Sequence, residues 1–222
     1  MNLSERTLAI HQKLLEVYGA PTWRQPLPPL DELVSTILSQ NTNDTNRDRA
    51  FEALRRAFPT WEAVRDADQA AVIAAIRSAG LANQKGPRIQ AVLRAITAQR
   101  GRLDLDFLAE MPAQEAQDWL LQFKGVGPKT AAIVLLFSLG KPAFPVDTHI
   151  YRVSGRLGLR PDPMSVEQAH PHLAALFPAQ AYYTAHLNLI RLGREVCTAR
   201  KPHCESCPLA DFCDYFQQSK RT

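Results

Sequence analysis

The four cysteines of this 222-residue chain all lie between Cys197 and Cys213. Their spacing is Cys197-x6-Cys204-x2-Cys207-x5-Cys213, and the preceding 196 residues contain no cysteine. A secreted disulfide scaffold distributes its cysteines through the chain, so this cluster predicts metal ligands. The single Cys-x2-Cys pair is compatible with zinc, although zinc ribbons and knuckles generally combine two such pairs. The wider gaps favour a loop around a larger [4Fe–4S] cubane, with zinc and free thiols as the alternatives.

A second chemically suggestive segment is KGVGPKT, residues 124–130. Gly125 and Gly127 permit close approach of the backbone to a ligand, and Pro128 suits the first turn of a following helix. The free N–H groups of such a turn and of the helix N-terminus point the same way and favour an anion. With DNA as the partner, that anion is a backbone phosphate, which positions the protein without reading the base sequence. A plain αα-hairpin also favours glycine and proline, so the segment alone leaves both interpretations open.

Lys129 and Asp147, which are 18 residues apart, are the candidates for covalent chemistry. Lys129 is predicted in the first turn of a helix, where the helix dipole and partial burial favour the neutral, nucleophilic form of an amine. Asp147 opens another predicted helix, where the simplest role is an N-cap. A carboxylate near such an amine also helps to deprotonate or orient it. Taken alone, Lys129 is better explained as a phosphate contact.

Together these segments resemble the endonuclease III family of DNA glycosylases and abasic-site lyases. FKGVGPKTA is similar to the family's helix–hairpin–helix, LPGVGxKTA, and VDTHIYRV is similar to its second signature, VDTHxxRV. The cysteine spacing matches the family's C-terminal [4Fe–4S] loop, and the likeness covers about residues 10–213 in family order. Two hairpin positions depart from the pattern: Phe123 replaces leucine, and Lys124 replaces a proline, which loosens the entry to the turn and adds a cation.

The resemblance assigns a role to most of these residues. It implies that Lys129 is the nucleophile, that Asp147 faces it across the base-binding pocket, and that the four cysteines hold a [4Fe–4S] cluster. The residues that it implies in DNA contacts are Gln40, Leu81, Gly125, Val126, Gly127, Thr130 and His149. Gln40, Leu81 and His149 also have plain structural explanations, as a helix-terminal polar residue, a C-cap contact and an ordinary helix residue. Arg200 and Lys201, between the first two cysteines, predict a phosphate-binding loop that the cluster supports.

The family's substrates are oxidised pyrimidines and abasic sites in duplex DNA. The target base must leave the duplex, which costs a few kcal/mol. Attack of a neutral lysine on C1′ then releases the base, leaves an imine and leads to β-elimination, so Lys129 predicts a bifunctional enzyme. One alternative is a mismatch-specific glycosylase, but many of these lack the hairpin lysine, and the adenine enzymes extend further than the nine residues after Cys213. The other is a non-catalytic DNA-binding or redox-sensing iron–sulfur protein.

These residues must be positioned by helices. Apolar residues recur at helical spacing along most of the chain, and no convincing run alternates with a period of two, so we predict an all-α fold. Representative stripes are Ile10, Leu14, Val17 and Tyr18; Leu33, Val34 and Ile37; and Ile89, Val92, Leu93 and Ile96. Thr60 and Asp68 are predicted N-caps, and Ser165 with Gln168 forms a capping-box pattern.

We expect two helical domains with a DNA-binding cleft between them. Residues 21–134 would form a multi-helix barrel that includes the hairpin, and residues 1–20 with 135–222 would form the iron–sulfur domain. Residues 1–123 contain 14 Lys/Arg and 15 Asp/Glu, whereas residues 124–222 contain 12 and 7, so the basic second half suits a polyanion. The N-terminus has no apolar signal core. We therefore expect a monomeric, cytoplasmic, nucleoid-associated protein that acts on double-stranded DNA and not at a membrane.

Overall fold

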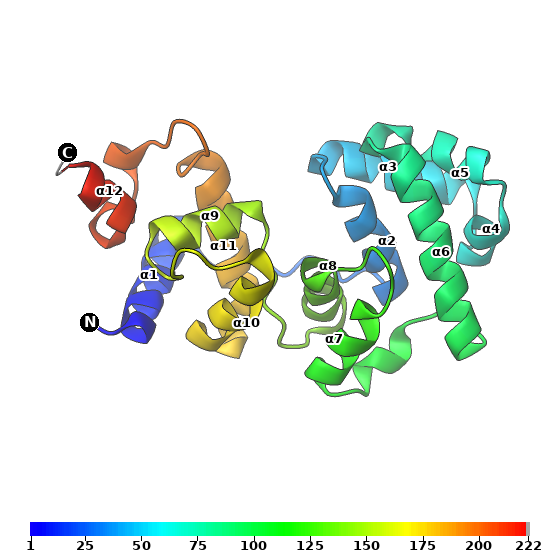
Figure 1. Cartoon of the computed structure of the whole chain (residues 1–222), viewed down its shortest axis with the longest axis horizontal. Helices are drawn as coiled ribbons and strands as arrows, with labels where there is room; N and C mark the ends of the chain where they lie inside the picture. Colours follow the sequence, from blue (N-terminus) through cyan, green and yellow to red (C-terminus); the bar gives the residue numbers. More distant parts are fainter. Residues whose placement is uncertain (221–222) are drawn as a thin grey trace. The chain divides into compact units, whose positions relative to one another are not determined.

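The computed structural model describes residues 1–220, which contain helices and turns but no β-strand (Figure 1). The predicted all-α class is confirmed. The chain divides into two compact units, Pro26–Lys141, here the central unit, and Met1–Gln25 with Pro142–Thr222, here the terminal unit. The sequence-based boundaries fall after residues 20 and 134, whereas the structure changes unit after Gln25 and Lys141, because the apolar helix after the hairpin stays whole in the central unit.

The central unit is built of seven α-helices joined by short turns. They are α2 (Pro29–Ser39), α3 (Asp44–Ala57), α4 (Trp61–Asp66), α5 (Gln69–Ala75), α6 (Ala82–Arg100), α7 (Ala113–Leu121) and α8 (Pro128–Ile133). Two 3₁₀ turns, η1 (Arg77–Ala79) and η2 (Asp106–Ala109), precede α6 and α7. The long helix α6 lies against α4 and α5, and α2 packs on α3 and α8 (Figure 1). The fully buried apolar side chains include Leu33, Ile37, Leu54, Ile76, Ile89, Leu93 and Ile96.

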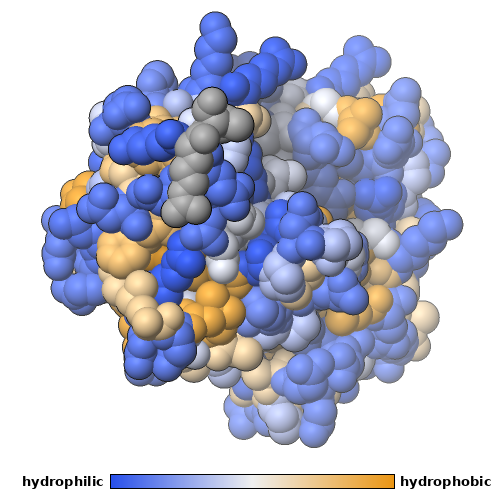
Figure 2. Space-filling model, turned by 60° about the vertical axis from the view of Figure 1, so that its left-hand side comes forward, coloured by the Kyte–Doolittle hydropathy of each residue, from blue (hydrophilic) through white to orange (hydrophobic). Residues whose placement is uncertain are grey.

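Up to residue 220, the terminal unit contains five α-helices and the cysteine loop. The helices are α1 (Leu3–Tyr18), α9 (Thr148–Arg156), α10 (Val166–Leu176), α11 (Tyr182–Glu195) and α12 (Asp214–Ser219). Helix α9 packs along α11, and α1 packs on α10 and α11. Their core includes Ile10, Leu14, Ile150, Val153, Leu173 and Leu189. The face drawn in Figure 2 is mostly hydrophilic, with hydrophobic residues in small separate groups.

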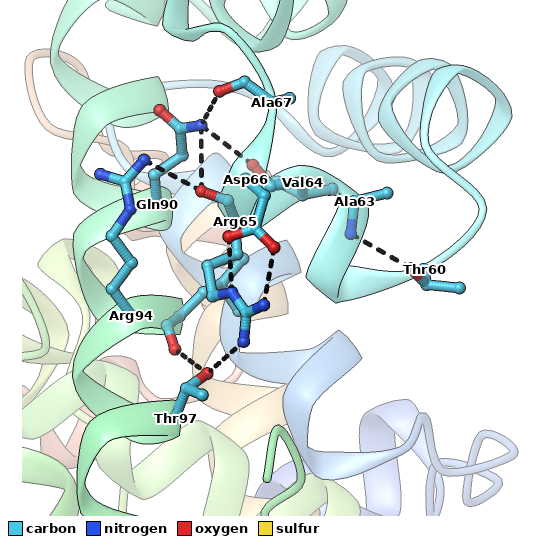
Figure 3. A network of polar contacts seen from close by, with 10 residues as sticks. Thr60, Ala63, Val64, Arg65, Asp66, Ala67, Gln90, Arg94 and Thr97 are labelled. Atoms are coloured by element: carbon cyan, nitrogen blue, oxygen red, sulfur yellow. Dashed lines mark hydrogen bonds and ion pairs between the residues drawn. The ribbon is translucent and has the colours of Figure 1, made fainter. Parts of the chain in front are cut away.

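Most of the predicted helix caps are present. Thr60 Oγ1 accepts the Ala63 N–H at 3.1 Å (Figure 3), and Ser165 and Gln168 form the capping box before α10. Two local predictions are wrong. The side chain of Asp68 makes no capping hydrogen bond at α5, and Val17, assigned to the buried stripe of α1, is 48% exposed.

The apolar segment after α8 adopts a π-helical turn, η3 (Val134–Ser138), which the sequence did not predict. Its residues are almost all apolar, so no periodic pattern distinguishes a π-turn from an α-helix there. The segment ends where the Lys141 N–H donates to the Leu135 carbonyl at 2.9 Å. Within residues 1–220, no helix combines the length and apolar character that crossing a lipid bilayer requires.

Candidate active site and metal centre

The predicted hairpin is present between α7 and α8. The Val126 N–H donates to the Phe123 carbonyl at 2.9 Å, Gly125 has a φ of 94°, and Pro128 occupies the first position of α8. Gly127 has an extended backbone with a φ of −96°, so only Gly125 needs the left-handed region of glycine. Val126 and Thr130, predicted to contact DNA, are 4% and 3% exposed. In this conformation, their side chains belong to the core, and only their backbone is available to a ligand.

Gln40 lies beside the hairpin turn although 85 residues separate it from Gly125. It follows α2 with an extended backbone, and its Nε2 donates to the Gly125 carbonyl at 3.4 Å. Arg88 of α6 donates from Nη1 to Gln40 Oε1 at 2.7 Å. A Cβ added to Gly125 would lie 2.3 Å from Arg88 Cδ. The aliphatic part of the Arg88 side chain therefore occupies the space that any side chain at residue 125 would need. Arg88 therefore joins the end of α2 to the hairpin.

Leu81 occupies the turn between η1 and α6. It is 46% exposed, and it has a left-handed backbone with a φ of 49°, directly after Gly80 with a φ of 67°. Its carbonyl accepts the Lys85 N–H at 2.9 Å, which begins α6. A large apolar side chain is thus held in solvent by a backbone conformation that residues other than glycine rarely adopt.

Lys129 is the second residue of α8, and its side chain is half-buried. The hairpin turn directly precedes it, so any group bound at the turn lies close to the helix end that carries the lysine. The Ala131 N–H donates to the Gly127 carbonyl at 3.0 Å, which makes this first turn regular. The helix thus presents the amine from a fixed position rather than from a mobile loop.

Asp147 is the N-cap of α9 in the terminal unit. Its Oδ1 accepts the Ile150 N–H at 2.8 Å, the predicted capping role, and its side chain is half-buried. A capping aspartate accepts the backbone N–H with one carboxylate oxygen, so its second oxygen can accept another hydrogen bond. Lys129 and Asp147 belong to different units of the chain.

His149 lies two residues into α9, packed against α11. Its Nδ1 is 3.1 Å from Arg152 Nη2, which also donates to the Gly193 carbonyl at 2.8 Å. A Cβ added to Gly193 would lie 2.9 Å from His149 Cβ, so glycine at this position lets the two helices approach closely. The packing of α9 on α11 thereby fixes the direction of the helix that Asp147 caps.

The four cysteines line one cavity in the terminal unit. About 270 Å³ inside it is free of protein atoms, part of it continuous with solvent, and the walls also include Val196, Pro202 and Phe216. None of the four forms a disulfide. Among residues 1–220, no three His, Cys, Asp or Glu side chains converge as ligands of a single metal ion. Four sulfurs distributed around an apolar hollow fit a [4Fe–4S] cubane, which takes one thiolate on each iron.

Two arginines of α9 bind the first part of the cysteine loop. Arg152 Nε donates to the Cys197 carbonyl at 3.0 Å, and Arg156 donates to the carbonyls of Thr198 at 2.7 Å and Ala199 at 2.9 Å. Arg156 Nη1 also donates to Cys197 Sγ at 3.3 Å.

 The Arg156 guanidinium packs 4.7 Å from the centre of the Tyr215 ring, on the wall of the cavity. The helix that begins at Asp147 therefore also holds the loop that contains Cys197.

The rest of the loop presents its cations to solvent. Arg200 and Lys201 are exposed, and the Lys201 carbonyl accepts the Thr198 hydroxyl at 2.7 Å, which closes the turn that carries them. Burial raises the pKa of the Cys207 and Cys213 thiols, so forming thiolates there is costly without a cation. Bound iron removes that cost, because it stabilises the thiolate form.

Sequence reasoning missed Lys85 and Arg88. Lys85 is 1% exposed, and its Nζ donates to the carbonyls of Leu38 and Ala79, each at 2.8 Å. Its position four residues before Ile89, on the apolar stripe of α6, was the available signal for its burial. Arg88 had no such signal, because its partners Gln40 and Gly125 come from distant segments.

Two protein-family profiles match the chain. Residues 34–178 match the profile described as "HhH-GPD superfamily base excision DNA repair protein". Residues 197–213 match the "Iron-sulfur binding domain of endonuclease III", a range that begins and ends at the first and last cysteine. The [4Fe–4S] cluster predicted from the cysteine spacing is therefore supported independently by the family profile and by the cavity.

Curated relatives agree with these profiles. A putative DNA glycosylase of Arabidopsis thaliana is 36% identical over 83% of this chain and 66% of its own length. Endonuclease III of Sulfolobus acidocaldarius is 36% identical over 83% of this chain and 81% of its own length. The DNA glycosylase/AP lyase ROS1 of Arabidopsis thaliana is 34% identical over 70% of this chain. The chain spans just under two thirds of the first of these relatives and only 12% of ROS1.

A solved structure gives the same result at the level of the fold. The structure of a non-covalent endonuclease III–DNA complex superimposes with a TM-score of 0.85, at 27% sequence identity, and each chain is covered completely. The hairpin, the helix that Asp147 caps and the cysteine loop thus occur together in a fold of that type. This chain belongs to the HhH-GPD superfamily of base-excision DNA repair proteins and, within it, to the endonuclease III family of DNA glycosylases.

Proposed function

We propose that this chain is a bifunctional DNA glycosylase and abasic-site lyase that removes oxidised pyrimidines from duplex DNA. The observation that carries the proposal is Lys129, half-buried in the first turn of α8 directly after the hairpin. A DNA glycosylase that relies on water alone does not need an amine at this position. Membership in the endonuclease III family supports the assignment of this amine as the nucleophile.

In the proposed reaction, Lys129 and Asp147 serve the same deoxyribose. The Lys129 amine forms a bond to C1′ while the N-glycosidic bond breaks, and the electron pair of that bond leaves with the base. The Asp147 carboxylate stabilises positive charge on the sugar and helps to accept the amine proton. The nitrogen lone pair then expels O4′ from C1′, and a proton added to O4′ completes the ring opening to a protonated imine. This imine acidifies the C2′ hydrogen, and its removal as a proton expels the 3′ phosphate with the electron pair of the C3′–O bond. The strand is therefore cut as well as freed of its base.

The proposed DNA contacts come from both units. The backbone of Gly125, Val126 and Gly127 holds a phosphate near α8, and Thr130 stabilises the same turn from the core. The positions that fill the duplex or meet the extruded base are Gln40, Leu81 and His149. Arg200 and Lys201 add phosphate contacts from the cysteine loop. The enzyme acts as an intracellular monomer on double-stranded DNA.

Borohydride trapping tests the covalent step. Reduction of the imine on a thymine-glycol duplex should give a stable protein–DNA adduct, and Lys129→Ala should lower its yield by a factor on the order of a thousand or more. Lys124→Ala is the matched control, because it removes an exposed cation from the same turn. That control should weaken duplex binding and leave trapping intact. A trapped adduct in Lys129→Ala, or none in the parent chain, contradicts the proposal.

The preferred base is tested by a panel of duplexes. Thymine glycol, dihydrouracil, an abasic site, 5-methylcytosine and thymine opposite guanine would be compared in single-turnover nicking assays. We expect the two damaged pyrimidines and the abasic site to be cut fastest. Faster release of thymine opposite guanine would favour the mismatch-specific alternative, and binding without any nicking would favour a non-catalytic iron–sulfur protein.

A further inference from the structure

Lys85 is the largest fully buried side chain of the described residues. Its Nζ donates to two backbone carbonyls, those of Leu38 and Ala79, and no carboxylate forms an ion pair with it within residues 1–220. Burial, followed by the positive charge of Arg88, lowers the pKa of Lys85. An amine in such a place is costly compared with an apolar side chain of similar volume. The role of the Lys85 ammonium therefore depends on the two segments that it joins.

Those segments are the ends of two helical elements. Leu38 belongs to the last turn of α2, and Ala79 is the last residue of η1. Each end carbonyl lacks a partner within its own helix, so the ammonium satisfies groups that the helices leave open. Because α6 begins immediately after η1 and carries Lys85, one side chain connects three elements at one point.

Each of these helix ends runs into a strained turn. Among the described residues, the non-glycine residues with positive φ are Asn41, at 52°, and Leu81, at 49°. Asn41 comes three residues after Leu38, and Leu81 comes two residues after Ala79. A left-handed conformation strains such a residue, and it persists where the surrounding structure imposes it. Lys85 binds the segment directly before each of the two turns.

The two turns also carry Gln40 and Leu81, which the proposed function inserts into the base stack. We propose that Lys85 is a positioning residue, whose ammonium fixes the end of α2 against the end of η1 and so sets the separation at which Gln40 and Leu81 enter the duplex. This inference rests on the proposed function. Arg88, one turn further along α6, complements it by binding Gln40 Oε1. Helix α6 thus holds both the backbone before Gln40 and the end of its side chain.

The test compares Lys85→Met with Gln90→Met. Gln90 is the matched control, because it lies on α6, is fully buried, and donates from Nε2 to the carbonyls of Val64 at 3.0 Å and Ala67 at 2.8 Å (Figure 3). Lys85→Met loses two hydrogen bonds to carbonyls, and Gln90→Met loses two of similar length and a longer one to the Arg65 carbonyl at 3.5 Å, but the carbonyls near Gln90 border neither of the strained turns. A general loss of stability therefore affects both variants, whereas a positioning defect affects only Lys85→Met.

The measurement is the single-turnover nicking rate at saturating protein on two substrates. One has thymine glycol in a fully paired duplex, and the other has the same lesion in a short unpaired bubble, where little energy is needed to open the stack. In Lys85→Met, the ratio of bubble rate to duplex rate should rise about tenfold relative to the parent chain. Gln90→Met should keep the parent ratio. The fluorescence of 2-aminopurine opposite the lesion should likewise fall in Lys85→Met alone.

An unchanged ratio in Lys85→Met, or an equal rise in Gln90→Met, would refute the positioning role. If Lys85→Met does not fold, Lys85→Gln takes its place, because its shorter amide retains one donor and should give an intermediate ratio. If neither variant folds while Gln90→Met does, Lys85 is needed for folding and the inference is rejected. A parent chain that nicks neither substrate would instead overturn the proposed function, so the two failures are distinct.

Discussion

The hairpin turn of the central unit and the cysteine loop of the terminal unit are both irregular, but their conformations are fixed in different ways. The turn is shaped by its own residues, through the positive φ of Gly125 and the hydrogen bond from Val126 to Phe123, and its further contacts with Gln40 and Arg88 come from the same unit. The loop has only two 3₁₀ turns of its own, η5 (Cys204–Ser206) and η6 (Ala210–Phe212). Its first residues are bound by arginines of α9, and its sulfurs surround the cluster cavity.

This difference separates a locally encoded element from one that depends on distant partners. The hairpin carries Lys129 and should keep its shape whatever happens in the terminal unit. The loop shares α9 with Asp147, so a disturbance of the loop reaches the proposed catalytic carboxylate through Arg152 and Arg156. The cluster should therefore matter for Asp147 and for the exposed cations of the loop, but not for the hairpin.

Removing one cluster ligand is the most severe test of this difference. Cys207→Ser should lose iron and destabilise the terminal unit by several kcal/mol, because the binding energy of a structural metal is part of the folding energy. If Arg200 and Lys201 lose their phosphates, the slope of log K for duplex binding against log salt should shrink by about 2. Iron content, denaturant unfolding and binding titrations at several salt concentrations measure these effects.

Ser206→Ala is the control for that variant, because Ser206 is the exposed neighbour of Cys207 and points its hydroxyl at the His203 carbonyl. It should retain iron and the parent salt slope. Full duplex affinity in iron-free Cys207→Ser would show that the loop keeps its shape without the cluster, and the contrast with the hairpin would disappear.

The same contrast explains how much the sequence revealed. The hairpin, the all-α class and the caps at Thr60 and Ser165 were predicted, because each depends on residues that are neighbours in the chain. The four cysteines were predicted as ligands, because their types and spacing are chemical information in themselves. Such signals survive without any knowledge of tertiary structure.

What the sequence did not reveal depends on tertiary contacts. The apolar stripe of α6 signals the burial of Lys85, but its carbonyl partners follow from the meeting of α2, η1 and α6, which no local pattern encodes. The contact of Arg88 with Gly125 joins residues from different segments, and the π-turn Val134–Ser138 lies in an apolar run without periodicity. Asp68 has the right type for a cap and lacks the capping bond, so residue type alone does not fix side-chain geometry.

Gly125→Ala tests the local encoding of the hairpin and should have a smaller effect. Alanine is strained at a φ of 94°, and its Cβ would lie 2.3 Å from Arg88 Cδ, so Arg88 must move. We expect a loss of about 1–2 kcal/mol in the free energy of unfolding. The displaced Arg88 also releases Gln40, so nicking of paired duplex should fall as well. Denaturant unfolding with unchanged iron content measures the first effect.

Gly127→Ala provides the control two residues further along the same turn. Its backbone is extended, and no heavy atom lies within 4 Å of an added Cβ, so its unfolding free energy should stay near that of the parent. Duplex binding should still weaken, because a methyl group there separates the backbone from a phosphate. Equal destabilisation by both substitutions would contradict the claim that Gly125 alone requires glycine.

The smallest predicted effect concerns His11 on α1 of the terminal unit. Its ring meets the edge of Phe177 at 6.2 Å, and its Nδ1 is buried without a hydrogen-bond partner among the described residues. Burial lowers the pKa of His11 below its usual 6.5. In the window between the two pKa values, the unfolded chain binds more protons than the folded chain, so stability rises with pH. The stabilisation is complete above pH 6.5 and is lost as pH falls through the folded pKa.

His11→Gln removes this titration and keeps a polar side chain of similar reach. As pH falls below 6.5, the parent chain should therefore lose unfolding free energy relative to the variant. Urea unfolding of both proteins across this pH range measures this difference. The contributions of the carboxylates cancel, because both proteins contain the same ones. Parallel curves would mean that His11 is equally solvated in both states, and acid sensitivity of the terminal unit would then have to arise from the cysteine loop itself.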